Sequence, residues 1–318
     1  MRKKKLGKQG PELSVIGFGA WEAGGDTWGP NPSEEGVIEA IHAALDAGIE
    51  WIDTAEVYGS GESERILGKA LPGRRDDVFL ATKVAPKPVG SGFAPDQIRR
   101  ACEASLRRLQ TDRIDLYQLH WPDSGGNPLE ESWEAMAGLV EEGLVRFVGV
   151  SNFPKPFIET CLSIRHVDSL QPEFSLLQVG LRDLIDWCGE KGVGVVAYGP
   201  LAYGLLTGAM EPSTTFDDRD WRSGKREVPQ PQMFRPGKIE RSLAVVEGLR
   251  PIADRLDITV AQLALAWVFH QPGVTSAIAG SRNPKHVREN AAAGSVELDE
   301  KTLTEIESLI PLGPDFSG

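Results

Sequence analysis

Short apolar runs alternate along the chain with longer segments in which apolar residues recur at helical spacing. Short, nearly continuous runs rich in β-branched residues indicate strands that are buried on both faces. The candidate strands are Val15–Phe18, Trp51–Asp53, Val78–Lys83, Asp115–His120, Arg146–Ser151, Ser169–Gln171, Val193–Tyr198 and Ser276–Ala279. An alternation of this kind is typical of βα units that build a parallel sheet.

Helices are predicted between these strands from the spacing of the apolar residues. In Ser33–Ala47 the apolar residues follow the 3.6-residue period, and Gly48 is a suitable stop. Pro95–Leu109 begins with a proline in its first turn, where the missing N–H costs little. Glu130–Glu142 is a third candidate, and Val260–Phe269 is apolar almost all round, which predicts a deeply packed helix.

Eight strands separated by helices predict a closed (β/α)8 TIM barrel, with residues 1–318 forming one domain. The alternative is a doubly wound open sheet, which would carry a G-x-G-x-x-G turn after its first strand. Residues 17–21 read Gly-Phe-Gly-Ala-Trp and do not match that turn. We therefore expect the barrel.

Two segments lie outside the alternation. Lys5–Ser14 resembles a hairpin around Gly10-Pro11, which we expect to close the bottom of the barrel. Gly199–Gly237, after the seventh strand, is a long loop without regular periodicity. Loops of this length are usually lids or binding loops, although the part around Asp217–Asp220 also reads as a plain surface excursion.

Composition and charge narrow the function classes. The net charge of −12 and the pI near 5.0 argue against binding to nucleic acid or to anionic lipid surfaces. The three cysteines lie far apart, form no C-x-x-C pair and cannot all be paired, which favours a reducing compartment. No apolar segment follows the basic start, and no run is long enough to span a membrane. We expect a cytoplasmic protein, either a monomer or a homo-oligomer.

Polar or aromatic residues close most of the predicted strands, which in an α/β barrel places them together at the C-terminal mouth. They are Asp53, Lys83, His120, Ser151, Asn152, Gln171 and Tyr198, in chain order. Any one of them could be a helix cap or a satisfied core group. The whole set at one edge of the barrel indicates a site.

Four of the residues near this edge suggest acid–base chemistry at a carbonyl group. A buried lysine such as Lys83 tends to lose its proton, and a neighbouring carboxylate such as Asp53 restores the charge. We expect the Lys83 cation to lower the pKa of Tyr58 from the usual value of about 10, so that the phenol can donate a proton. His120 would orient the carbonyl group. A Schiff-base aldolase that uses Lys83 is a rival interpretation.

Four stretches carry a resemblance to a known family. Residues 48–55 read Gly-Ile-Glu-Trp-Ile-Asp-Thr-Ala, with Tyr58-Gly59 shortly after, and residues 115–122 read Asp-Leu-Tyr-Gln-Leu-His-Trp-Pro. Residues 148–153 read Val-Gly-Val-Ser-Asn-Phe, and residues 280–282 read Gly-Ser-Arg, with Glu-Asn at 289–290. In this order, along nearly the whole chain, they resemble the aldo-keto reductase family. The stretch 118–122 is more similar to its bacterial and channel-subunit branches.

The resemblance implies NADPH-dependent reduction of aldehydes or ketones to alcohols, with Tyr58 as the proton donor. Lys83 and Asp53 match the pair that tunes this tyrosine, and His120 matches the residue that orients the substrate. Ser151, Asn152 and Gln171 match residues that bind the nicotinamide amide, and Tyr198 matches a ring that stacks on the nicotinamide. The further cofactor residues implied are Gly199, Pro200, Leu201, Gly280, Ser281, Arg282, Glu289 and Asn290.

One departure from the family concerns the cofactor phosphate. Many members carry Pro-Lys-Ser at the last strand, whereas residues 278–282 here read Ile-Ala-Gly-Ser-Arg. A guanidinium presents a fork of donors that suits a phosphate, so we expect Arg282 to bind the 2′-phosphate of NADPH. A solvated arginine at a helix start is the other interpretation.

The sequence says less about the substrate and the partners than about the fold and the cofactor. Trp21, Trp28 and Trp121 lie just after strand ends or on the first loop, and an aromatic mouth suits an apolar carbonyl compound. The histidines show no ligand spacing, so we expect no metal. The alternative function is an NADPH-binding regulatory subunit of a membrane channel, because such subunits share these motifs.

Overall fold

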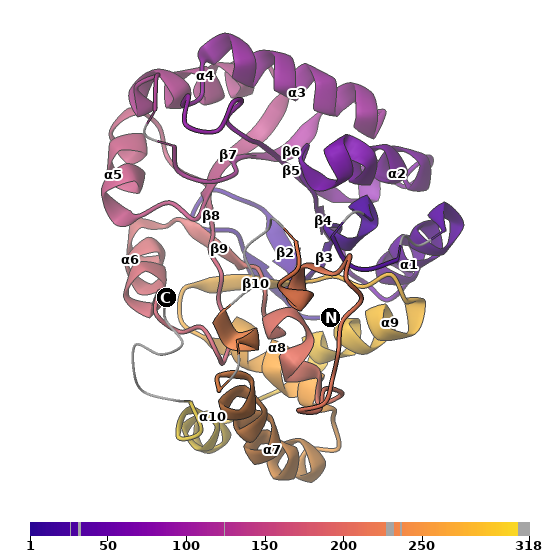
Figure 1. The fold of residues 1–318 in the computed structure, drawn as a ribbon. Helices are drawn as coiled ribbons and strands as arrows, with labels where there is room; N and C mark the ends of the chain where they lie inside the picture. Colours follow the sequence, from indigo (N-terminus) through magenta and orange to yellow (C-terminus); the bar gives the residue numbers. More distant parts are fainter. Residues whose placement is uncertain (26, 31–32, 124, 227–231, 236, 311–318) are drawn as a thin grey trace.

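Eight parallel strands close into a barrel in the computed structural model, which describes residues 1–25, 27–30, 33–123, 125–226, 232–235 and 237–310 (Figure 1). In chain order they are β3 (Ile16–Gly19), β4 (Trp51–Asp53), β5 (Phe79–Val84), β6 (Ile114–Leu119), β7 (Val145–Ser151), β8 (Ser169–Gln171), β9 (Gly194–Ala197) and β10 (Val274–Ala279). Strand β10 pairs with both β9 and β3 and so completes the ring. The predicted (β/α)8 barrel is confirmed.

All eight predicted strands lie in this barrel; β4 and β8 have the predicted bounds, and the ends of the others are shifted by at most two residues. The largest shift is at β10, which begins at Val274 because Val274 pairs with Val195 on β9. The interior of the barrel is filled by bulky apolar side chains, among them Trp51, Phe79 and Leu116. This packed core supports the polar residues at the upper ends of the strands.

Helices surround the barrel (Figure 1). In the described residues they are α1 (Glu34–Asp46), α2 (Glu62–Ala70), α3 (Pro95–Leu109), α4 (Leu129–Glu141), α5 (Lys155–Ile164), α6 (Arg182–Lys191), α7 (Ile239–Arg255), α8 (Val260–His270), α9 (Pro284–Ala292) and α10 (Glu300–Glu307). The hydroxyl of Ser33 accepts from the Gly36 amide and so caps α1. Thr259 and Gln262 form a capping box that starts α8, which is buried on nearly every side as predicted.

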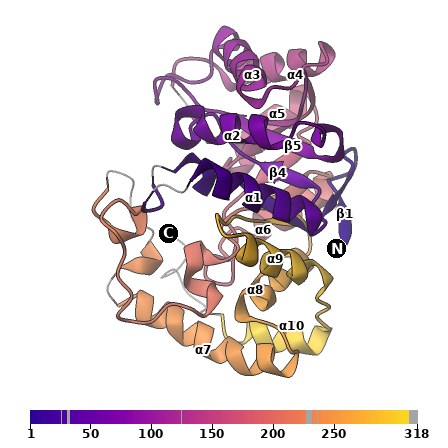
Figure 2. The same ribbon diagram turned by 90° about the vertical axis from the view of Figure 1, so that its right-hand side faces the viewer.

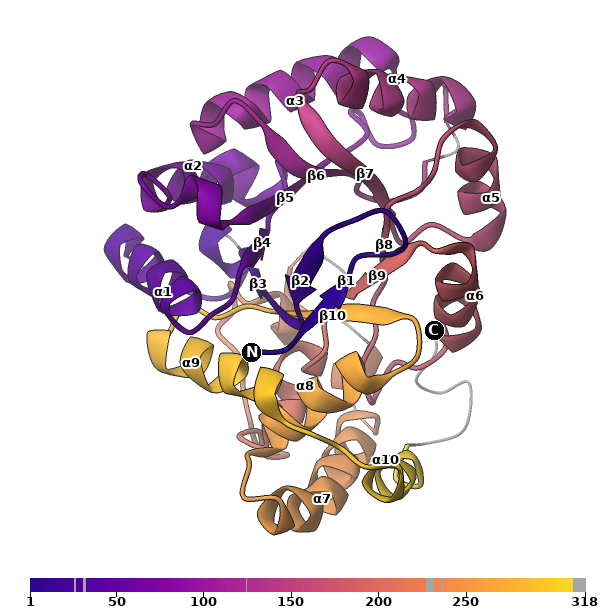
Figure 3. The ribbon, with the colours of Figure 1, turned by 180° about the vertical axis from the view of Figure 1, so that it is seen from behind.

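The predicted N-terminal hairpin is formed by β1 (Lys3–Lys5) and β2 (Glu12–Ser14), so its first strand begins slightly earlier than expected. Figure 3 shows this hairpin lying across the end of the barrel opposite the view of Figure 1. Leu6 and Leu13 join the apolar cluster inside the barrel. The hairpin therefore closes the bottom of the barrel and leaves the upper end for the site.

The connection after β9 covers part of the end of the barrel that lies opposite the N-terminal hairpin (Figure 2). Residues 227–231 and 236 of this connection lie outside the described residues. Three short 3-10 helices lie along it: Ala202–Thr207, Trp221–Ser223 and Gln232–Phe234. Asp220 is buried and forms an isolated bridge with Trp28 on the loop after β3. At Asp220 the connection is therefore a packed part of the mouth rather than a surface excursion.

Cys102, Cys161 and Cys188 are buried and free, as the sequence suggested, and burial raises the pKa of each thiol to about 12. They lie on α3, α5 and α6 and act as apolar packing groups. Among the described helices, none has both the length and the apolar character that crossing a membrane requires.

Candidate active site

A cavity of about 750 Å³ opens at the C-terminal ends of the barrel strands. It is where an α/β barrel is expected to carry its site. Lys83 lies beneath the cavity, and every other residue predicted for the site lines it. These lining residues are Trp21, Trp28, Asp53, Tyr58, His120, Trp121, Ser151, Asn152, Gln171, Tyr198, Gly199, Pro200, Leu201, Gly280, Ser281, Arg282, Glu289 and Asn290.

Lys83 is fully buried at the end of β5, and its ammonium group is enclosed by oxygen atoms. Its Nζ donates to Asp53 Oδ2 at 2.5 Å, to the Thr54 carbonyl oxygen at 2.8 Å and to Tyr58 Oη at 3.3 Å. Burial lowers the pKa of Lys83, and the Asp53 carboxylate opposes that shift. The ion pair keeps a cation directly below the phenol oxygen.

Tyr58 follows β4 in a tight turn, the 3-10 helix Tyr58–Gly61. Gly59 has a φ of 58°, and a side chain there would collide with the backbone of Gly24, so the turn depends on glycine. The prediction that the pKa of Tyr58 falls below its usual value was wrong. Burial raises that pKa well above 10, and the charge of Asp53 raises it further. The phenol is therefore protonated at neutral pH and can act as a donor.

His120 packs against Tyr58 with a ring-centroid distance of 5.6 Å and an interplanar angle of 77°. Burial lowers the pKa of His120 well below 6.5, and the positive charge of Lys83 lowers it further. The imidazole is therefore neutral at physiological pH. Its Nδ1 is buried and has no partner among the described residues, while the ring itself faces the cavity. A neutral imidazole here can share a hydrogen bond with a ligand.

Amide and hydroxyl groups gather on the side of the cavity formed by β7 and β8. Ser151 Oγ donates to the Gln171 carbonyl oxygen at 2.9 Å, and Gln171 Nε2 donates to Asp53 Oδ1 at 2.9 Å. Asn152 has a φ of 59°, a left-handed conformation that asparagine tolerates well. Its Oδ1 accepts from Tyr198 Oη at 3.1 Å. Ser151, Asn152 and Gln171, which the family resemblance assigns to the nicotinamide amide, thus lie close together.

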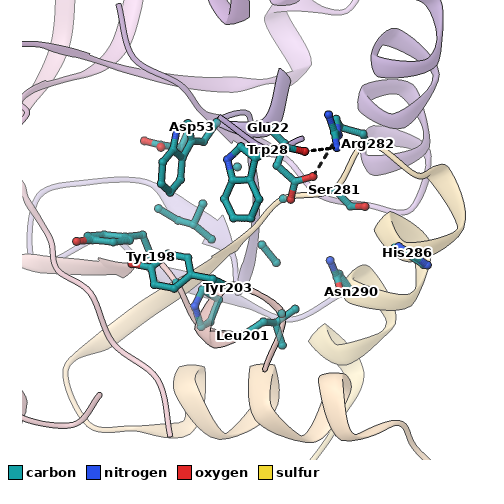
Figure 4. A pocket seen from close by; sticks show the side chains of 18 of the residues that line it. Glu22, Trp28, Asp53, Tyr198, Leu201, Tyr203, Ser281, Arg282, His286 and Asn290 are labelled. Carbon is teal, nitrogen blue, oxygen red and sulfur yellow. Dashed lines mark hydrogen bonds and ion pairs between the residues drawn. The ribbon is translucent and has the colours of Figure 1, made fainter. Parts of the chain in front are cut away.

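Arg282 lies at the opposite side of the cavity, just before α9 (Figure 4). Its guanidinium donates to the carbonyl oxygens of Trp28 and Pro30, at 2.8 and 2.9 Å. Glu22 Oε2 lies 3.6 Å from Arg282 Nε. Burial raises the pKa of Glu22, and the charges of Arg282 and Arg222 oppose that shift. Arg282 therefore holds the loop after β3 instead of projecting into solvent.

The upper wall of the cavity is aromatic. Trp21 stacks on Tyr58 with a centroid distance of 6.0 Å, and its ring also lies 5.1 Å from each of Trp28 and Trp221. Tyr203 meets Trp221 edge to face at 4.8 Å. The aromatic mouth expected from three tryptophans is thus larger than predicted.

Among the cavity residues that were not predicted from the sequence are the charged or aromatic side chains of Glu22, Tyr203, Trp221 and Arg222. Tyr203 and Trp221 lie on the long connection, and aromatic residues in a loop already suspected of binding were a usable signal. Glu22 and Arg222 carried no such signal, because their places depend on how two loops pack together.

Among the described residues no group of three or more histidine, cysteine or acidic side chains could hold a metal ion. The charges beside the phenol are instead those of Lys83 and Asp53, held by the contacts described above. The arrangement supplies a protonated phenol above a buried cation, next to a neutral imidazole. Such a group can donate a proton to an oxygen that gains negative charge.

Known proteins are similar to this chain along nearly its whole length. The family model described as "Aldo/keto reductase family" matches residues 15–311. The chain is 35% identical, over 330 aligned positions, to the protein named aldo-keto reductase YhdN of Bacillus subtilis (strain 168), covering 99% of this chain and 97% of that one.

Solved structures give the same result. The glycerol dehydrogenase AKR11B4 from Gluconobacter oxydans has a TM-score of 0.84 and 31% identity, with 98% of this chain and 97% of that chain covered. An aldo/keto reductase from Klebsiella pneumoniae, solved in complex with NADP and acetate, has a TM-score of 0.75 and 33% identity, with 98% and 96% covered. The chain belongs to the aldo/keto reductase family of oxidoreductases.

Proposed function

We propose that the protein uses NADPH to reduce aldehydes or ketones to alcohols, with Tyr58 as the proton donor. One observation carries the proposal: the Tyr58 hydroxyl lines the cavity and lies 3.3 Å from the buried Nζ of Lys83. Membership of the family and its relatives' complexes with NADP or NADPH support the choice of cofactor.

The residues present fit the two ends of NADPH. Ser151, Asn152 and Gln171 present hydroxyl and amide groups suited to a carboxamide, and the Tyr198 ring lies beside them. At the far end, Ser281 and Arg282 precede α9, and the Ser281 hydroxyl and the Arg282 guanidinium can donate to a phosphate. Bound NADPH supplies a hydride to the carbonyl carbon.

The protein's own groups act on the carbonyl oxygen. Tyr58 Oη holds the proton that this oxygen takes up as negative charge develops on it. Lys83 and Asp53 form the ion pair beneath, and the Lys83 cation favours the phenolate that remains after the proton leaves. His120, which is neutral, orients the same oxygen through a hydrogen bond.

We propose that Arg282 binds the 2′-phosphate and thereby favours NADPH over NADH. The guanidinium already lies at the cavity, and a phosphate would replace one or both of the carbonyl oxygens of Trp28 and Pro30 as its acceptor. A charge-assisted, two-pronged contact is stronger than contacts with neutral carbonyl oxygens. The loop after β3 would adjust as the cofactor enters.

The aromatic wall supports an apolar carbonyl substrate. Trp21, Trp28 and Trp121 line the cavity near Tyr58, and Trp221 adds a fourth indole to the same wall. Flat rings of this kind bind apolar and aromatic groups well. The carbonyl group itself would lie between Tyr58 and His120.

No observation favours the two rival functions. The family's description and the names of the relatives from Bacillus, Gluconobacter and Klebsiella do not refer to a channel. A Schiff-base reaction would need an accessible amine, whereas Lys83 is fully buried and donates to three oxygen atoms. We also infer a single domain, residues 1–318, and a cytoplasmic location, which three free cysteines support.

The test is to mix purified protein with NADPH and 4-nitrobenzaldehyde and to follow the absorbance of the reduced cofactor, with NADH in parallel. We expect oxidation that depends on the aldehyde and is faster with NADPH. Tight binding of NADPH without turnover across several aldehydes and ketones would contradict the proposed reaction.

A further inference from the structure

Gln171 connects the two halves of the site. It lies at the end of β8 and is almost fully buried. Its side-chain nitrogen donates to Asp53 Oδ1 at 2.9 Å, and its backbone carbonyl oxygen accepts from Ser151 Oγ at 2.9 Å and from the Asn152 amide at 3.1 Å. One residue thus contacts both the carboxylate beneath Tyr58 and the polar groups on β7.

The chemistry of Asp53 fixes which way the Gln171 amide points. An ionised carboxylate oxygen only accepts hydrogen bonds, so the amide nitrogen of Gln171 must face Asp53. The amide oxygen is then directed away from Asp53, and no hydrogen bond to it is seen among the described residues. Because Gln171 lines the cavity, this oxygen is the acceptor that the residue can offer to a ligand.

The same contact fixes the rotation of the carboxylate. Asp53 Oδ2 takes the Lys83 ammonium and Oδ1 takes the Gln171 amide, so each oxygen has its own donor. The Gln118 amide also points at Oδ1, but at 3.5 Å it is at the limit of a hydrogen bond. Gln171 is therefore the main support that keeps Asp53 aligned with Lys83.

We propose that Gln171 is a two-ended positioning residue that links the placement of nicotinamide to the alignment of the proton donor. Its amide oxygen accepts from the NH2 of the nicotinamide carboxamide, and its amide nitrogen holds Asp53. Through Asp53 it sets the position of the Lys83 ammonium, which lies 3.3 Å from Tyr58 Oη. This inference rests on the proposed function, which already gives Gln171 to the carboxamide, and adds its role in holding Asp53 and so in placing the cation beside Tyr58.

Two substitutions separate the two ends of Gln171. In Gln171→Glu the new carboxylate can still accept from the carboxamide, but it donates to Asp53 only when it is protonated. In Gln171→Met the side chain keeps about the same length and loses both hydrogen bonds. Gln118→Met is the matched control, because it removes only the long contact with the same oxygen.

The first measurement is the pH profile of kcat with saturating NADPH and aldehyde. For Gln171→Glu we expect the ratio of its kcat to that of the unaltered protein to fall at least tenfold between pH 5.5 and 8.5, as the introduced carboxyl loses its proton. For Gln171→Met we expect a loss of about 10- to 100-fold at every pH, and for Gln118→Met a loss below threefold, as its weak contact implies. A pH-independent ratio for Gln171→Glu would overturn the link to Asp53.

The second measurement is calorimetric binding of NADP+ and of its 3-acetylpyridine analogue, in which a methyl group replaces the carboxamide NH2. The loss of one hydrogen bond corresponds to about a 5- to 10-fold preference for NADP+ over the analogue. We expect this preference in the unaltered protein and in Gln171→Glu. We expect no preference in Gln171→Met. An equal preference in the unaltered protein and in Gln171→Met would overturn the cofactor end. This binding result does not need turnover, so it separates failure of this inference from failure of the proposed reaction.

Discussion

The two sides of the cavity differ in which groups hold their charged side chains. On the side of β4, β5 and β6, the Lys83 ammonium already has three oxygen partners, and two donors hold the carboxylate of Asp53. On the side of β10, the Arg282 guanidinium is held by backbone carbonyl oxygens and by Glu22, and these partners belong to a loop.

The difference shows what each side needs from ligand binding. The groups around Tyr58 are in place beforehand, which spares the reaction the cost of arranging charges. The Arg282 side has partners that a phosphate could replace, so the phosphate binding that we propose there would require an exchange of contacts with the loop after β3. We therefore expect substitutions on the first side to lower kcat and those on the second to weaken cofactor binding.

Tyr58→Phe gives the sharpest test of the first side. We expect kcat to fall by about 10³- to 10⁴-fold, because no other phenol contacts Lys83 in the described part of the chain. The dissociation constant for NADPH should change by less than about threefold. Steady-state kinetics and fluorescence titration give the two values. Tyr117→Phe, a buried tyrosine outside the cavity, should leave kcat unchanged. Near-normal turnover in Tyr58→Phe would remove this residue from its role.

Lys83→Met tests whether the ion pair is needed for both folding and activity. Removing one partner of a buried pair leaves Asp53 charged and unpaired, so we expect the free energy of unfolding to fall by about 3–5 kcal/mol. We expect kcat to fall by about 100-fold. Urea unfolding and kinetics measure the two effects. In Lys83→Met/Asp53→Asn the stability should largely return and kcat should not. A full recovery of kcat in that double variant would contradict the role given to the cation.

Arg282→Ala tests the second side. We expect NADPH to bind about 10- to 100-fold more weakly, since a charge-assisted contact with phosphate is lost, and NADH binding to change little. Calorimetry with both cofactors measures this. Glu22→Gln removes a carboxylate that competes for Arg282 and should tighten NADPH binding about two- to fivefold. An equal loss for NADPH and NADH in Arg282→Ala would refute the phosphate contact.

His120 gives the smallest expected effect, which concerns stability and pH. Its pKa in the folded protein lies well below the unfolded value of about 6.5, so below that pH the unfolded chain binds a proton that the folded chain does not. The stability present above pH 6.5 is therefore lost as the pH falls, by up to about 1.4 kcal/mol per pH unit for this group. Urea unfolding at pH 7.5 and 5.5 should show a smaller loss in His120→Asn. The same loss in both proteins would show that His120 titrates normally when folded.

The sequence was informative where a local pattern decides the structure. Short apolar runs located every barrel strand, since a strand buried on both faces leaves few other compositions. Four helices with clear periodicity or end signals were predicted, and α3 was predicted to the residue. Helix α2 was not predicted, because it is short and few of its residues are apolar. Its Glu64 is fully buried, and its carboxylate accepts hydrogen bonds from Arg108 and Thr82, which lie outside the helix.

Properties that depend on several distant residues could not be predicted. The pKa of Tyr58 was given the wrong direction, because the lysine was considered and the combined effect of burial and of the Asp53 charge was not. The bond between Gln171 and Asp53 joins residues 118 positions apart, and no local pattern indicates it. Trp221 meets Trp28 only because the two loops cross at the mouth of the barrel.

The hairpin at the bottom of the barrel has a practical consequence. It seals the end of the molecule that faces away from the cavity, and Met1 lies beside it (Figures 2 and 3). A tether attached at the N-terminus would fix the protein to a bead or an electrode with the cavity facing the liquid. Cofactor and substrate would then enter the cavity from the side that faces away from the support.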